Sequence, residues 1–141
     1  MVEVLRIAAF SDGAVGGNPA GVVIADVLPD EAEMQRIAAE VGYSETAFAA
    51  PQDGSWRVRY FAPQREVPFC GHATIALGAA LALREGDGTF ALHLNDATIT
   101  VEGRRAGATV AAALQSPPTW STPTPAELVA DTLRLFGYSE N

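Results

Sequence analysis

With 141 residues, of which 48% are apolar, the chain has the size of one domain, and we expect a single domain over residues 1–141. Seventeen acidic residues against nine basic ones, all arginine, give a net charge of −8, which argues against a nucleic acid partner. The N-terminal segment has an acid at Glu3 and no basic leader, and no apolar run has the length of a bilayer span, so we expect a cytoplasmic protein without a membrane partner. Cys70 is the single cysteine, which excludes a disulfide within the chain.

The first half of the chain predicts four strands and one helix. Apolar alternation between turn formers predicts strands at residues 2–10, 20–25, 46–50 and 56–61. Between the second and third strands, apolar residues recur at helical spacing, with Asp30 as N-cap and Gly42 as the C-terminal stop. One face of this helix therefore covers a core.

The second half predicts a helix over residues 72–83, followed by three strands. The strands are expected at residues 89–94, 97–102 and 109–114. Asn95 and Asp96 form the turn between the first two, and the sequence GRRAG at residues 103–107 is expected to be the turn before the third.

A proline-rich connector precedes a last predicted helix. Thr124 and Glu127 have the spacing of a capping box, with Pro125 at the first helical position, and Gly137 ends the helix.

The helix over residues 72–83 is unusual because it is apolar on every side. The surrounding stretch, VPFCGHATIALGAALAL at residues 67–83, has no Asp, Glu, Lys or Arg. A helix that is apolar all round must be buried all round, and its many Ala and Gly residues keep it thin. We therefore expect an α+β fold in which an antiparallel, barrel-like sheet wraps a central apolar helix.

The start of this helix holds Cys70, Gly71 and His72. Its first backbone N–H groups lack partners within the helix and lie at the positive end of its dipole, so the amides of about residues 72–74 favour an anion such as a carboxylate. The structural alternative is that Cys70 is a small buried hydrophobe and His72 a cap or core residue. Sequence patterns alone leave both readings open.

Three motifs, in order along the chain, resemble the PhzF-like family of phenazine-biosynthesis isomerases and epimerases. They are GGNPAGVV at residues 16–23, YSETAF at 43–48 and FAPQREVPFCGHAT at 61–74. The family is similar to diaminopimelate epimerase and proline racemase. The resemblance implies a barrel around a central helix, and proton transfer beside a carboxylate or imine without metal or organic cofactor.

The resemblance also implies roles for the charged and reactive residues. Glu45 of the Ser-Glu-Thr motif matches the general acid/base, and His72 matches the histidine that holds the developing charge. Cys70 stands where racemase relatives place a catalytic thiol, so it is the alternative base. Without the resemblance, Glu45 reads as a solvent-facing residue at a strand edge.

The substrate-binding residues implied by the resemblance lie in two places. Gly17 and Asn18 match the loop that lines the pocket, and Gly71, Ala73 and Thr74 belong to the helix start whose amides hold the substrate. The expected substrate is a small amino- or imino-acid-like carboxylate of secondary metabolism. For Asn18, a turn residue before a proline is the alternative.

The family pattern has a second domain that this sequence does not match. Members are about twice as long, and their second domain supplies an acidic residue in an Asp-Pro-x-Thr-Gly-like motif that is absent here. We therefore expect a split enzyme that forms a heterodimer with a second PhzF-like half-domain. A homodimer, a domain without catalysis, and a non-catalytic module that binds small anions are the alternatives.

Overall fold

The computed structural model describes residues 2–139, which form an α+β fold of eight strands and three helices. The elements in chain order are β1 (Leu5–Ala9), β2 (Asn18–Ile24), α1 (Glu31–Val41), β3 (Thr46–Gln52), β4 (Ser55–Ala62), β5 (Arg65–Val67), α2 (Gly71–Glu85), β6 (Gly88–His93), β7 (Thr98–Ala106), β8 (Thr109–Gln115) and α3 (Ala126–Leu135). Every predicted strand and helix is present, and β5 is a short strand that the sequence did not predict.

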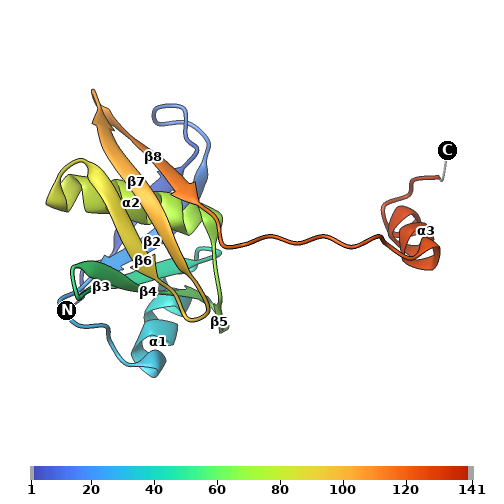
Figure 1. The fold of residues 1–141 in the computed structure, drawn as a ribbon, viewed down its shortest axis with the longest axis horizontal. Helices are drawn as coiled ribbons and strands as arrows, with labels where there is room; N and C mark the ends of the chain where they lie inside the picture. The colour runs from blue at the N-terminus through green and yellow to red at the C-terminus, as the bar shows by residue number, and fades with distance from the viewer. Residues whose placement is uncertain (1, 140–141) are drawn as a thin grey trace.

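The strands form one strongly curled sheet, a half-barrel with α2 running through its curl (Figure 1). Their order is β1-β2-β3-β4-β6-β7-β8, with β5 paired to β4. The sheet is mixed, because β2 pairs with β3 and β4 pairs with β6 in parallel. The expectation of an antiparallel sheet is wrong at these two places, since α1 and α2 lie in the connections and return the chain in the same direction.

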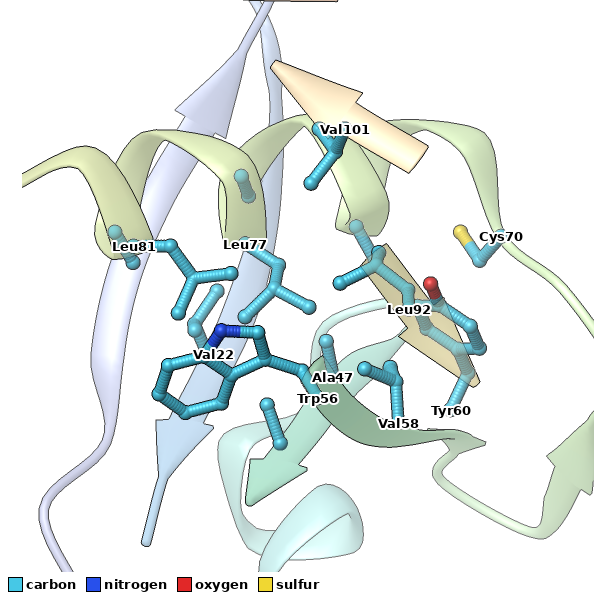
Figure 2. Packing of buried hydrophobic residues seen from close by; sticks show 14 of the residues in the cluster. Val22, Ala47, Trp56, Val58, Tyr60, Cys70, Leu77, Leu81, Leu92 and Val101 are labelled. Atoms are coloured by element: carbon cyan, nitrogen blue, oxygen red, sulfur yellow. The ribbon is translucent and has the colours of Figure 1, made fainter. Parts of the chain in front are cut away.

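The central helix is buried on most of its surface, as its sequence predicts. All but one of residues 72–82 of α2 are buried, and the side chains around it form the main core (Figure 2). Trp56, Tyr60, Leu77 and Leu92 are among the large members of this cluster. The absence of charge over residues 67–83 thus reflects burial within the sheet.

Strand β7 comes very close to α2, and this contact corrects the predicted GRRAG turn. Residues 103–106 belong to β7 and pair with β8 up to Ala106 opposite Thr109, so the turn is only residues 107–108. A Cβ on Gly103 would lie 2.3 Å from the carbonyl oxygen of Gly78. Gly103 is therefore needed for close packing of strand on helix and not for a turn.

Helix α1 covers the other face of the sheet and has the predicted caps. Asp30 Oδ1 accepts a hydrogen bond from the Glu33 N–H at 2.8 Å, and Gly42 has a left-handed conformation with φ 72°. Beneath the helix lies a second apolar cluster, whose buried members are Val23, Met34, Ile37, Ala38, Phe48 and Phe61.

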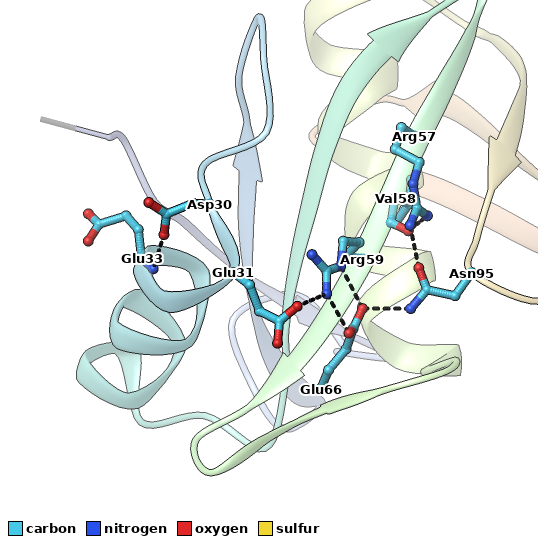
Figure 3. A network of polar contacts seen from close by, with 8 residues as sticks. All are labelled: Asp30, Glu31, Glu33, Arg57, Val58, Arg59, Glu66 and Asn95. Atoms are coloured by element: carbon cyan, nitrogen blue, oxygen red, sulfur yellow. Dashed lines mark hydrogen bonds and ion pairs between the residues drawn. The ribbon is translucent and has the colours of Figure 1, made fainter.

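A polar network ties α1, β4, β5 and the β6–β7 loop together on this outer face (Figure 3). Arg59 Nε donates to Glu66 Oε1 at 2.7 Å, and Arg59 Nη2 donates to Glu31 Oε2 at 2.8 Å. Asn95 joins Glu66 to Arg57. The Arg59 side chain is only 18% exposed, and its guanidinium holds the pKa of Glu66 below its usual range.

The last helix starts one residue later than expected. Helix α3 begins at Ala126, with Pro125 at the cap position and no side-chain hydrogen bond to the first turn, so the predicted capping box is wrong. The N-cap position is residue 125, so the Thr124 side chain lies one residue too early to accept hydrogen bonds from the first helical amides. An extended connector holds α3 away from the half-barrel, and none of its residues is buried (Figure 1).

No helix within residues 2–139 combines the length and apolar character needed to cross a membrane.

Candidate functional site

Glu45, Cys70 and His72 meet at the N-terminal end of α2. Glu45 directly precedes β3, Cys70 is the extended cap residue of α2, and His72 lies in the first helical turn. Cys70 Sγ is 3.4 Å from Glu45 Oε2 and 3.1 Å from His72 Nδ1, and His72 Nε2 is 3.7 Å from Glu45 Oε2. The structure therefore brings together the predicted acid/base, the alternative base and the predicted histidine.

The first turn of α2 is fixed from behind by Thr74 and Tyr60. The Thr74 hydroxyl donates to the Cys70 carbonyl oxygen at 2.7 Å, so the Tyr60 hydroxyl, 2.7 Å from Thr74 Oγ1, is the donor in that pair. Burial raises the pKa of Tyr60 well above its usual range, which keeps this donor protonated. The position of Cys70 is thus set by buried hydrogen bonds of the core.

The cluster is partly open to solvent. The side chain of Glu45 is 22% exposed and that of His72 is 9% exposed. Burial raises the pKa of the Cys70 thiol to about 11, and the nearby Glu45 carboxylate acts in the same direction, while the amides of Ala73 and His72 oppose it. The thiol is therefore protonated near neutral pH and serves as a hydrogen-bond donor.

One proton arrangement accounts for all three hydrogen bonds of the cluster. The Cys70 thiol donates to Glu45 Oε2, which leaves its sulfur to accept from His72 Nδ1–H. His72 Nε2 then accepts from the Ser44 hydroxyl, 3.3 Å away. In this arrangement His72 is neutral, and Glu45 is a carboxylate that receives a hydrogen bond from the thiol.

The remaining predicted residues of α2 differ in what they offer a ligand. A Cβ on Gly71 would meet no atom within 4 Å, so the space beside it is open. Thr74 N–H donates to the Cys70 carbonyl at 3.0 Å, and its hydroxyl is also used within the helix. Thr74 thus stabilises the helix start, and the amides of Gly71, His72 and Ala73 are the ones that precede the first helical hydrogen bond.

Gly17 and Asn18 lie near the cluster's end of the sheet, without a described contact to it. The Gly21 N–H donates to the Glu45 carbonyl at 3.2 Å, and β2 runs parallel to β3, so Asn18 at the start of β2 lies toward the Glu45 end. Gly17 has φ 83°, and a Cβ there would lie 2.7 Å from the Ala9 carbonyl oxygen. This position therefore requires glycine.

Ser44 and Tyr60 contact residues of the site, although the sequence assigned them no role. Ser44 precedes Glu45 in the Ser-Glu-Thr motif, which was the available signal for Ser44. The buried Thr46 hydroxyl that follows Glu45 makes no hydrogen bond to any residue within 2–139. The bond of Tyr60 to Thr74 depends on tertiary structure, so no local pattern signals it.

The same cluster has the donor atoms of a metal site. A carboxylate oxygen of Glu45, the Cys70 sulfur and an imidazole nitrogen of His72 all lie within 4.8 Å of one another. Zinc accepts such ligands, but it requires the thiolate, so binding would release the Cys70 proton. The expectation of a site without metal stays a prediction.

Comparison with known proteins supports a shared fold and family. The chain is 38% identical over 110 residues to the uncharacterized isomerase PA2770 of Pseudomonas aeruginosa, a match that covers 78% of this chain and 42% of that protein. It is 51% identical over 75 residues to the uncharacterized isomerase YddE of Escherichia coli, covering 52% of this chain and 25% of that protein. The chain spans less than half the length of these relatives.

Solved structures give the same result. A predicted epimerase, PA4716, from Pseudomonas aeruginosa superposes with a TM-score of 0.74 at 28% identity, over 81% of this chain and 42% of that one. A PhzC/PhzF protein from Clostridium difficile, described as a putative phenazine biosynthesis protein, superposes with a TM-score of 0.68 at 29% identity, over 72% of this chain and 40% of that one. Residues 7–139 match the family described as "Phenazine biosynthesis-like protein". The chain therefore belongs to this PhzF-like family.

Proposed function

We propose that the chain is one half of a cofactor-independent isomerase or epimerase that moves a proton beside the carboxylate of a small amino- or imino-acid-like metabolite. The observation that carries this proposal is the approach of Glu45 to Cys70 at the start of α2, 3.4 Å between carboxylate and thiol. A proton acceptor and the positive end of a buried helix dipole thus lie side by side.

The proposed chemistry uses these two features in turn. The substrate carboxylate binds the amides of Gly71, His72 and Ala73, which precede the first helical hydrogen bond, and the space beside Gly71 is open. Glu45 removes a proton from the adjacent carbon, so a C–H bond breaks and an O–H bond forms on Glu45. The electron pair left behind is stabilised by the amides and by His72. Return of the proton to the same carbon or to another completes the reaction.

Glu45 is preferred to Cys70 as the base because of their protonation. With a pKa of about 11, the Cys70 thiol is protonated at neutral pH. Only its small thiolate fraction could accept a proton from the substrate. Glu45 is partly exposed, so its carboxylate is accessible from solvent. The thiol then acts by holding the Glu45 carboxylate in place.

A second half-domain on a separate chain is proposed to complete the site. The relatives are named isomerases and an epimerase, and this chain covers 42% of PA2770 and of PA4716. The site residues described here lie at one end of a single half-barrel, and a reaction that removes and returns a proton on opposite faces needs an acid on the far side of the substrate. A homodimer is the alternative source of that acid.

Hydrogen exchange into candidate substrates tests the proposal. The chain is mixed with the separately expressed remainder of PA2770, and deuterium uptake from solvent at the carbon beside the carboxylate is followed by NMR over a panel of amino and imino acids. Glu45→Gln should abolish uptake, whereas the exposed control Glu102→Gln should retain it.

The variants in which deuterium uptake is lost distinguish Glu45 from Cys70 as the base, and an enzyme from a binding module. Uptake that survives Glu45→Gln and disappears in Cys70→Ser assigns the base to the thiol. Binding of a carboxylate without uptake in any mixture, including the chain alone, favours the anion-binding module instead.

A further inference from the structure

The cluster of Glu45, Cys70 and His72 brings three different kinds of metal-ligand atom to one place. Although the chain is rich in acidic residues, this is the one group of three or more His, Cys, Asp and Glu side chains within residues 2–139 whose ligand atoms lie within 4.8 Å of one another. A carboxylate, a thiol and an imidazole together suit zinc, whereas magnesium and calcium prefer oxygen ligands alone. The cluster therefore selects for an ion of the zinc type.

The spacing of these atoms agrees with a single tetrahedral ion. Cys70 Sγ is 3.1 Å from His72 Nδ1 and 3.4 Å from Glu45 Oε2. Zinc bonds of about 2.0–2.3 Å at tetrahedral angles place two ligand atoms about 3.4–3.6 Å apart. Small side-chain shifts thus admit the ion between the three residues, in place of the protons that now lie between them.

Neighbouring groups hold two of the ligands in place. The chain enters α2 at Cys70 (Figure 2), and the Thr74 hydroxyl fixes the Cys70 carbonyl there through a hydrogen bond of 2.7 Å. With His72 Nδ1 on the ion, Nε2 carries the ring proton and donates it to Ser44 Oγ, 3.3 Å away. An outer hydrogen bond of this kind orients metal-bound histidines, and its loss costs about 10–100-fold in metal affinity.

The charges at the site favour a divalent ion once the thiol has lost its proton. The N-terminal end of α2 is equivalent to about half a positive charge, which opposes a cation. The Glu45 carboxylate and the Cys70 thiolate carry two negative charges, which outweigh the helix end and neutralise the ion. A metal ion deprotonates a thiol that coordinates it, so a zinc–sulfur bond replaces the S–H bond and the proton leaves to solvent.

We propose that Glu45, Cys70 and His72 bind a zinc ion, with water as the fourth ligand, and that this ion inhibits the isomerase. Inhibition follows because the ion occupies the Glu45 carboxylate and so removes the base that accepts the substrate proton. Inhibition rests on the proposed function, whereas binding of the metal does not. The ion competes with the substrate and is not a cofactor of the reaction.

Cobalt(II) in place of zinc tests the binding directly, because a thiolate ligand gives it an intense absorption band in the near ultraviolet. Cobalt chloride added to the reduced chain should produce this band and saturate at one ion per chain, and zinc chloride should remove the band by displacing cobalt. Cys70→Ser should abolish the band. Glu45→Gln should weaken cobalt binding about tenfold or more, because a direct ligand contributes at least as much as an outer partner.

Two further variants separate a specific site from a general loss of structure. His93→Gln removes the other histidine of the chain, which contacts Thr98 and lies outside the cluster, so cobalt binding should be unchanged. Ser44→Ala removes the outer partner of His72 at an exposed position, so the fold should be kept while affinity falls about tenfold. Urea unfolding without metal checks that each variant is folded.

Deuterium uptake by the substrate, in the mixture that tests the proposed function, measures inhibition. Zinc chloride should stop uptake, excess substrate should weaken this inhibition, and a chelator should restore the original rate. Full uptake while zinc is bound overturns the proposal.

The cobalt spectra decide the metal site independently of catalysis. The proposal is wrong if the chain gives no thiolate band. It is also wrong if Glu45→Gln and Ser44→Ala bind cobalt as tightly as the unmodified chain, since the thiol then holds an adventitious ion only. If the metal-free mixture shows no uptake with any substrate, the proposed function fails, and the spectra still establish or refute the metal site.

Discussion

Replacing Gly103 by alanine tests the close contact between β7 and α2. The added Cβ would lie 2.3 Å from the Gly78 carbonyl oxygen and 2.8 Å from Ala82 Cβ, distances that real Cβ atoms do not adopt. Because the nearest atom belongs to the backbone, no rotamer change relieves the overlap, and the strand or the helix must move. Overpacking of this kind costs about 1–3 kcal/mol, and we expect Gly103→Ala at the upper end, about 3 kcal/mol. That is a large part of the 5–15 kcal/mol typical of a domain.

A second strand glycine provides the control. A Cβ on Gly88 in β6 would be 3.8 Å from its nearest neighbour, an ordinary contact, so Gly88→Ala should leave stability unchanged or raise it by about 0.4–1 kcal/mol. Urea unfolding is followed by the fluorescence of Trp56, which is 9% exposed, in a Trp120→Phe background because Trp120 is 86% exposed. Equal free energies of unfolding for the two variants would refute the close approach of helix and strand.

Three further predictions concern single side chains. Thr46→Val removes a buried hydroxyl that has no partner among the described residues, and it keeps the shape of the side chain, so urea unfolding should show equal stability or a gain of about 1 kcal/mol; a loss of that size would reveal a partner for the hydroxyl. Alkylation of Cys70 by iodoacetamide should keep accelerating up to about pH 11, and Glu45→Gln should speed it at any lower pH, because loss of the carboxylate lowers the thiol pKa; an unchanged profile contradicts the contact. Since Arg59 lowers the folded-state pKa of Glu66, the pair stabilises the fold above the ordinary glutamate pKa of about 4.3, and this stabilisation disappears as pH falls through the lowered pKa. The difference in unfolding free energy between the unmodified chain and Arg59→Met should therefore be largest at neutral pH and shrink in acid, whereas a constant difference would indicate lost packing alone.

The sequence predicted the elements whose signal is local. Asp30 and Gly42 mark the ends of α1 because caps depend on neighbouring residues, and the lack of charge over residues 71–82 of α2 follows directly from their burial. The length of β7 was missed for the opposite reason. Gly103 resembles a turn residue in the sequence, but its role is set by Gly78, which is distant along the chain.

In the candidate site, too, local signals were predictable and contacts between distant residues were not. Glu45 lies 25 residues before Cys70, and no periodicity relates the two positions, so only the resemblance to the PhzF-like family joined them before the structure did. The free amides near Cys70 were predicted from helix geometry, because the first N–H groups of any helix lack partners within it. The hydrogen bond from Ser44 to His72 and the support of Thr74 by Tyr60 depend on how β3, β4 and α2 pack, which a single sequence does not reveal.

The isolation of α3 means that the half-barrel and this helix are energetically separate. A ten-residue helix with no buried side chain gains nothing from packing, and peptides of this length are marginal helices in water. Removing the chain after Pro125 should consequently leave the melting temperature of the half-barrel where it was. The helical content of residues 126–135 will instead rise or fall with whatever surface they touch.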